Sequence, residues 1–136
     1  MIVIDASATI AFLLNEDAMF VDLDSLSGLN DEPLVVPSHW TAEVGNALVS
    51  NVRRGRLDRA EIPLFIHGLE RLDVEIVVPP NLAETALIAD QALKVGLTYY
   101  DAAYVHLALT RQASLFTLDG KIRDVATQMS VPILPK

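Results

Sequence analysis

Four carboxylates stand where this chain passes from one expected regular element to the next. Asp5 and Asp119 each close a short apolar run, and Glu43 and Asp101 each lie within about the first turn of an expected helix. Carboxylates gathered in one place repel one another, and a divalent cation is the usual means of neutralising them. The four residues therefore suggest a cation site, provided that the fold brings them together.

The chemistry of the donors indicates which cation such a site would hold. Oxygen ligands with no histidine or cysteine at ligand spacing favour Mg²⁺ or Mn²⁺ over zinc, and the chain contains no cysteine. Such an ion takes one or two carboxylates directly, while the others act through water or hold a second ion. Four acids suffice for one ion, or for the two ions of phosphodiester hydrolysis.

Each acid also has a purely structural explanation. Asp5 and Asp119 can cap helices, and Asp101 can complete a capping box that begins at Thr98. Glu43 is harder to explain in this way, because it lies beyond the cap positions on a helix whose neighbouring residues look buried. These neighbours are Ala42, Val44, Ala47 and Leu48. The coincidence of all four acids is what favours a function.

Other polar residues near the acids could assist them. Asn46 lies three residues after Glu43 on the same helical face, and Ser7 and Thr117 could cap helices or donate hydrogen bonds to the acids. A short stretch holds the first four basic residues of the chain, Arg53, Arg54, Arg56 and Arg59. These arginines either complement the dipole at a helix end or contact phosphate. Residues interpreted as packing or surface positions are His39, His67, His106, Trp40 and Tyr104.

The expected elements explain how the acids could meet. Strands are expected over 1–5, 34–37, 75–78, 114–117 and 131–134. Helices, cap residues included, are expected over 7–14, 16–26, 38–54, 58–72, 82–95, 98–111 and 119–129. Strands that alternate with helices, with no hairpin signal, predict an α/β fold with a parallel sheet and helices on both faces. Such sheets place ligands at the carboxyl ends of their strands.

Local signals set the expected helix boundaries. Ser38 is the expected N-cap of the helix that carries Glu43, and Asp58 with Glu61 has the spacing of a capping box. Pro63 lies slightly too deep in the following helix, which predicts a kink or an irregular first turn. Glycines expected just past helix ends are Gly28, Gly55 and Gly96.

Composition limits the class of protein. The 136 residues, of which 51% are hydrophobic and 21% charged, fit one globular domain. The net charge of −8 argues at first against nucleic acid, but the first 52 residues hold eight acids and no lysine or arginine. An acidic half beside a basic stretch suggests two different surfaces. The start of the chain lacks the features of a signal peptide, and no uncharged stretch reaches the roughly 20 residues of a membrane span, so we expect a cytoplasmic protein.

The chain resembles a PIN-domain ribonuclease of the VapC toxin type over essentially its whole length. The motifs that carry the resemblance are Ile4-Asp5-Ala6-Ser7, then Glu43-Val44-Gly45-Asn46-Ala47-Leu48, then Gly96 to Tyr104 continued by Leu107-Ala108, and finally Phe116-Thr117-Leu118-Asp119. Any one motif is weak, but all four in order and at this spacing are specific. The resemblance implies that residues 1–136 form a single PIN domain.

The resemblance has further implications for fold and function. It implies a five-stranded parallel sheet of order 3-2-1-4-5 and Mg²⁺-dependent endoribonuclease activity. It implies inhibition by a cognate antitoxin, and a homodimer that can enter a larger toxin–antitoxin assembly. Carried over by position, the acidic quartet is Asp5, Glu43, Asp101 and Asp119, and Asp124 is a candidate accessory acid.

Two other classes of protein also gather acids at one edge of a parallel sheet. A receiver domain needs a second acid beside Asp5 and an aspartate after the third strand, and a dehalogenase-type phosphatase needs Asp-x-Asp after the first strand. The chain has neither pattern, since Asp5 is followed by Ala6 and Ser7 and the third strand ends at Val78. Two alternatives stay open: an RNA-processing PIN nuclease that is not a toxin, and a PIN-like module that binds without cleaving.

Overall fold

The computed structural model describes residues 1–14 and 31–136 of the chain. The strands are β1 (Ile2–Ile4), β2 (Leu34–Val36), β3 (Glu75–Ile76), β4 (Ser114–Phe116) and β5 (Ile133–Leu134). The helices are α1 (Ala6–Leu14), α3 (Trp40–Arg53), the 3₁₀ turn η1 (Arg59–Glu61), α4 (Ile62–Arg71), α5 (Leu82–Val95), α6 (Tyr99–Arg111) and α7 (Gly120–Gln128). The helix expected over 16–26, with Gly28 at its end, lies outside the described residues.

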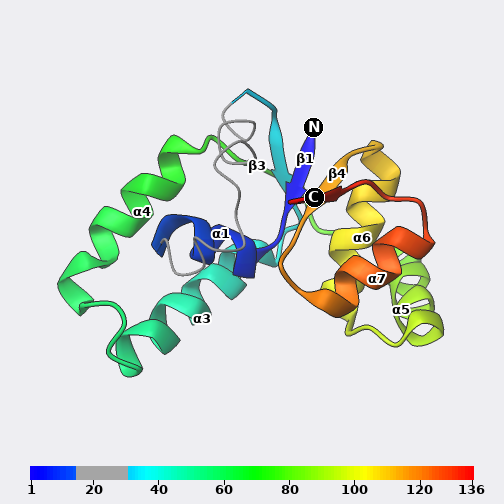
Figure 1. Ribbon diagram of the computed structural model, residues 1–136. Coiled ribbons are helices and arrows are strands. Elements are labelled where there is room, and N and C mark those ends of the chain that lie inside the picture. Colours follow the sequence, from blue (N-terminus) through cyan, green and yellow to red (C-terminus); the bar gives the residue numbers. More distant parts are fainter. Residues whose placement is uncertain (15–30) are drawn as a thin grey trace.

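The five strands form one parallel sheet of order β3-β2-β1-β4-β5, which confirms the predicted topology. Ile2 of β1 is in register with Leu34 on one side and with Ser114 on the other. The order of the strands reverses between β1 and β4, and sheets of this kind bind ligands at that switch point. Figure 1 shows α1, α3 and α4 on one side of the strands and α5, α6 and α7 on the other.

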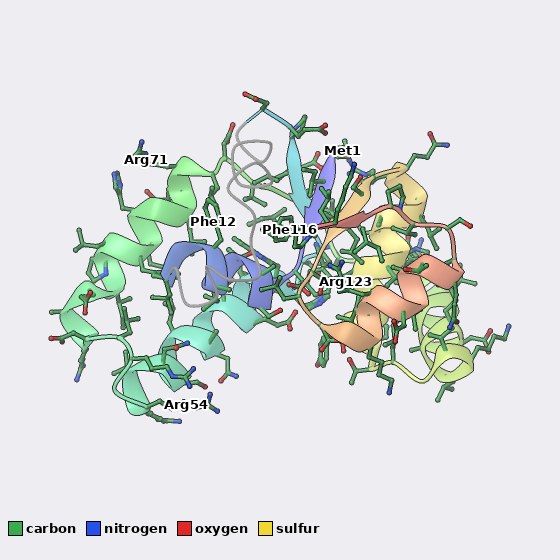
Figure 2. The ribbon with its side chains drawn as sticks, in the orientation of Figure 1. Met1, Phe12, Arg54, Arg71, Phe116 and Arg123 are labelled. Atoms are coloured by element: carbon green, nitrogen blue, oxygen red, sulfur yellow. The ribbon has the colours of Figure 1, made fainter. Side chains whose placement is uncertain are left out.

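The central strands are buried on both faces, as expected where helices cover both sides of a parallel sheet. Every side chain of β1 and β2 is buried, and in β4 the buried side chains are those of Leu115 and Phe116. Helix α6 packs against β1 and β4, and Figure 2 shows Phe116 at the centre of the molecule. No helix within the described ranges is long and apolar enough to cross a membrane.

The start of α3 differs from the prediction. Ser38 is not its N-cap: His39 occupies that position in a helical conformation, and no side chain caps the helix. The reason is a tight turn after β2, in which the Trp40 N–H donates to the Pro37 carbonyl over 3.1 Å. Ala42 was expected to be buried but is exposed. Trp40, Val44 and Leu48 recur every four residues on the buried face, and Ala42 lies off that row.

Most of the other local signals are confirmed. Asp58 and Glu61 form a capping box, but it opens η1, and α4 then begins with Pro63 in its first turn. The expected irregular start of this helix is therefore present. Gly55 and Gly96 follow the ends of α3 and α5 with φ near +70°, a conformation in which glycine lacks the penalty of a side chain. The strands are shorter than predicted, because a strand extends only as far as a neighbouring strand forms backbone hydrogen bonds with it.

Candidate active site

Asp5 lies at the carboxyl end of β1 and is only 3% exposed. Its Oδ1 accepts hydrogen bonds from the Ser7 hydroxyl at 2.9 Å and the Ala8 N–H at 2.8 Å, and its Oδ2 accepts one from the Thr117 hydroxyl. Thr117 directly follows β4 and is fully buried. Asp5 therefore caps α1 and also ties together the carboxyl ends of the two strands at the switch point.

Burial raises the pKa of Asp5 above its ordinary value. The three hydrogen bonds offset this effect only in part, and the negative charge of Glu43 raises the pKa further. A fixed, desolvated carboxylate of this kind is stabilised in its charged form by any cation placed beside it. A carboxylate retained in such a position, at a cost to stability, is typical of functional sites.

Glu43 lies in the first turn of α3 and receives two contacts at one oxygen. The Tyr104 hydroxyl donates to Oε1 over 2.8 Å, and His39 Nε2 lies 3.1 Å from the same atom. The His39 nitrogen is buried and has no hydrogen bond of good geometry to any described residue, so its contact with Glu43 is a close electrostatic one. Burial alone would raise the pKa of Glu43, but these contacts outweigh burial and lower it.

Asp101 lies in the first turn of α6, where the Thr98 hydroxyl accepts the Asp101 N–H at 3.1 Å. The Asp101 pKa is raised, chiefly by burial and then by the charges of Asp119 and Glu43, while Thr98 and His39 act in the opposite direction. The Thr98 half of the predicted capping box is thus confirmed, but no bond from the Asp101 carboxylate back to the Thr98 N–H is found among the described residues. The capping box therefore does not account for this carboxylate, whose pKa responds to the charges of two other acids.

Asp119 follows β4 and caps α7, since its Oδ1 accepts the Ile122 N–H at 3.0 Å. Its own N–H donates to the Thr117 hydroxyl over 3.1 Å, and this hydroxyl in turn donates to Asp5. A single buried threonine therefore links the ends of β1 and β4. The structural explanation for Asp119 is correct, and it does not exclude a second role for the carboxylate.

The four acids influence one another through their charges. Glu43 acts on both Asp5 and Asp101, and Asp119 acts on Asp101. Within residues 1–14 and 31–136, however, no three acidic or histidine side chains gather closely enough to hold one ion between them. The donor set fits Mg²⁺ or Mn²⁺, which prefer oxygen ligands, retain several waters and need only one or two direct carboxylates.

His39 and Tyr104 belong to this site, although the sequence suggested only packing roles for them. The His39 ring lies 5.0 Å from the Tyr104 ring and 5.2 Å from the Tyr100 ring, centroid to centroid. Tyr104 lies three residues after Asp101, on the same face of α6. This spacing was a signal that could have identified Tyr104 from the sequence.

The other candidate residues fall into three groups. Ser7 and Thr117 contact Asp5 directly, as described above. Asn46 and Asp124 are exposed, and no hydrogen bond joins either side chain to the four acids among the described residues. The arginines lie at the other end of α3: ten residues separate Glu43 from Arg53, which is about 15 Å along a helix. Figure 2 shows Arg54 at the end of α3 remote from the sheet.

Comparison with known proteins identifies the family. The model of the PIN domain family matches residues 2–128. "Ribonuclease VapC9" of Mycobacterium tuberculosis and "VapC ribonuclease Mb0985" of Mycobacterium bovis are each 30% identical over 137 residues, covering 100% of both chains. The crystal structure of PAE2754 from Pyrobaculum aerophilum has a TM-score of 0.64 and 23% identity, over 95% of this chain and 94% of that one, and supports the fold alone. The chain therefore belongs to the PIN domain family and, within it, to the VapC type.

Proposed function

We propose that this chain is a Mg²⁺- or Mn²⁺-dependent endoribonuclease that hydrolyses RNA phosphodiester bonds and acts as the toxin of a toxin–antitoxin pair. The observation that carries the proposal is the set of acids at the switch point, in which the charge of Glu43 acts on both buried Asp5 and Asp101. The names of the relatives, which describe ribonucleases, support the same activity. An RNA target would place the reaction in the cytoplasm, and residues 1–136 would act as a single catalytic domain.

The acids have distinct tasks in this proposal. Asp5 and Asp101 would hold the cation, because their raised pKa values are relieved by a neighbouring positive charge. The bound cation would activate water and stabilise the charge on the leaving oxygen. Glu43 has one oxygen engaged by Tyr104 and His39, so its other oxygen can orient water. Asp119 would act through water or support a second ion, while Ser7 and Thr117 hold Asp5 in place. Asn46, which is exposed, would orient a ligand or a phosphate.

The arginines would bind RNA away from the cleaved bond. Arg53 and Arg54 are exposed at the far end of α3, and Arg56 follows them in the turn. Contacts between arginine and phosphate position a strand without selecting its sequence. In this arrangement the acids would catalyse cleavage. The arginines would attract the RNA and so offset its repulsion by the net charge of −8.

The partners follow from charge and from the family. A cognate antitoxin would bind the acidic first 52 residues, which contain no lysine or arginine, through a basic segment. Such binding would weaken as salt rises, because exposed charge contacts are screened. We further propose a homodimer that can enter a larger assembly with the antitoxin.

The test is cleavage of labelled RNA by the pure chain with Mg²⁺, with Mn²⁺ and with EDTA. Asp5→Asn and Asp101→Asn should each lower the rate at least about a hundredfold, about 2.7 kcal/mol in the barrier. Equal rates in the variants, or cleavage that persists in EDTA, would contradict the assignment. Growth arrest on expression, with Asp5→Asn as the control, separates a toxin from an RNA-processing nuclease. Binding of RNA without cleavage under every condition would instead identify a binding module.

A further inference from the structure

A hollow lies beside His39 on the side of the sheet covered by α5 and α6. It has a volume of about 530 Å³, within the range of small-molecule sites. Its walls come from the turn between β2 and α3, the connection between β3 and α5, and the facing sides of α5 and α6. None of these residues has a task in the proposed reaction except His39, which lines the hollow and contacts Glu43.

His39 lies between the hollow and the proposed site of cleavage. One imidazole ring separates the cavity from the Glu43 carboxylate, since His39 Nε2 lies 3.1 Å from Glu43 Oε1. Tyr99 forms the neighbouring part of the wall, and its ring lies 6.0 Å from that of Tyr100. A strand whose phosphate lies at the acids thus has an adjacent nucleotide within reach of this cavity.

The walls suit a flat heterocycle with a polar edge. Val77, Pro79 and Leu107 provide apolar surface, and the polar side chains of Glu84, His106 and Thr110 face the same space. His106 is 9% exposed, and its Nε2 lies 3.3 Å from Glu84 Oε1. Proteins that read single-stranded RNA hold a base in this way, with apolar contact on its faces and hydrogen bonds on its edge.

The charges around the cavity favour a neutral base over a phosphate as its occupant. The charged and titratable groups that line it, other than Tyr99, are His39, Glu84, His106 and Arg111. Each cationic or potentially cationic group among them already contacts a carboxylate: His39 contacts Glu43, His106 contacts Glu84, and Arg111 contacts Glu75 at 3.0 Å. A phosphate would meet Glu84 with no uncommitted cation among the described lining residues, whereas a neutral base would not be repelled.

We infer that this cavity binds one base of the RNA beside the cleaved bond and selects bases that carry an exocyclic amino group. The Glu84 carboxylate accepts hydrogen bonds but cannot donate them when ionised. It therefore pairs with the amino groups of cytosine, adenine or guanine. On uracil the one donor of this edge, the ring N3–H, is flanked by two carbonyl oxygens that repel the carboxylate. The inference rests on the proposed ribonuclease activity and adds a sequence preference to it.

The test is cleavage of a randomised RNA pool, with the bases around each cut read by sequencing. In the unchanged chain, uracil should be depleted at one position beside the cut. Glu84→Gln should reduce this discrimination at least about fivefold, because glutamine can donate to a uracil carbonyl as well as accept. Ala103→Leu, which fills the cavity, should abolish the base preference at the same position. Ala86→Leu, on the exposed part of α5, should leave that preference unchanged.

Two results would overturn the inference while leaving ribonuclease activity intact. One is cleavage with no preference against uracil beside the cut, and the other is an unchanged preference in both cavity variants. If Ala103→Leu alters only the oligomeric state in light scattering, the cavity is a contact between copies of the chain and the inference fails.

A second measurement does not depend on cleavage at all. Titration with cytidine and with uridine, followed by the methyl resonances of Ala103 and Leu107, should show cytidine binding at least about fivefold more tightly. Ala103→Leu should abolish the cytidine response. No response to either nucleoside would overturn the inference, even if the chain proved not to cut RNA.

Discussion

Tyr104 donates its hydroxyl to Glu43 Oε1 over 2.8 Å, although the two residues lie 61 positions apart. Tyr104 is 1% exposed, and burial together with the charge of Glu43 raises its pKa far above the physiological range. The hydroxyl therefore remains a donor at every working pH. This bond joins α3 to α6 across the site and fixes which oxygen of Glu43 is available for chemistry.

Tyr104→Phe should slow RNA cleavage about tenfold, equivalent to about 1.4 kcal/mol in the barrier, because Glu43 loses the donor that orients it. The free energy of unfolding should fall by about 1 kcal/mol, the usual net value of one hydrogen bond. Rates at saturating RNA and urea denaturation measure the two effects. Tyr100→Phe, which removes a hydroxyl from a 57% exposed side chain on the same helix, is the matched control. If both variants cut at the normal rate, the Glu43 orientation is not controlled by Tyr104.

Asp101→Asn should stabilise the metal-free protein at neutral pH by about 0.5 kcal/mol or less, since a raised pKa is a cost to the folded state and solvent screens a half-buried group. The Asp101 pKa is raised in the folded state, so the folded protein holds the proton more tightly than the unfolded chain does. The ionised Asp101 carboxylate lowers the free energy of unfolding. This destabilisation is absent at pH values below the ordinary pKa of 3.8 and develops as the pH rises through the raised pKa.

Urea denaturation in EDTA, at a series of pH values, measures this difference between Asp101→Asn and the unchanged chain. The difference in free energy of unfolding should be near zero at acidic pH and largest at neutral pH. A difference of constant size, or one that grows as the pH falls, would contradict the assigned cause.

Mg²⁺ should raise the stability of the unchanged chain, because a ligand that binds only the folded state stabilises it by mass action. At a hundred times the dissociation constant the gain is about 2.7 kcal/mol. Asp5→Asn should lose this gain, and Asp124→Asn should retain it, because Asp124 is exposed on α7 and is not among the charges that shift the pKa of Asp5, Glu43 or Asp101. Thermal melts with Mg²⁺ and with EDTA give the comparison. A similar gain in Asp5→Asn would exclude Asp5 as a ligand.

Arg123→Ala should destabilise the chain by about 2 kcal/mol, because hydrogen bonds of a charged donor are stronger than average. Arg123 Nη1 donates to the Thr117 and Leu134 carbonyls at 2.9 and 3.2 Å, and Nη2 donates to the Pro135 carbonyl at 2.7 Å. The guanidinium thus holds β5 against the end of β4. Hydrogen exchange should report faster exchange at the Thr117 N–H, while Lys121→Ala on the exposed side of α7 should leave it unchanged. Equal protection in the two variants would argue against this role for Arg123.

Signals that act within a few residues were readable from the sequence. The capping box of Asp58 and Glu61, the Thr98 cap and the glycine after α5 each depend on neighbours in the chain, and all three are present. The parallel order was also predictable, because alternating strands and helices leave few other arrangements. The sequence therefore predicts that Asp5 and Asp119 lie at one edge of the sheet, as they do.

Features that depend on packing between distant elements were not readable. His39 was interpreted as a packing or surface residue, because its contact with Glu43 exists only once the turn after β2 sets the start of α3. Tyr104 was likewise assigned to the core, and it is buried there, but the destination of its hydroxyl depends on how α6 lies beside α3. Periodicity shows which face of a helix is buried and does not show which polar atom meets another.

The pairing of β1 with β4 has a consequence for biosynthesis. Ile2 is made well before Ser114, the first residue of one of its two neighbouring strands. Thr117 and Asp119, which complete the surroundings of Asp5, are made later still in a chain of 136 residues. A nascent chain therefore lacks the finished set of acids until the residues up to Asp119 have been made, and under the proposed function it cannot cut the RNA that encodes it before then.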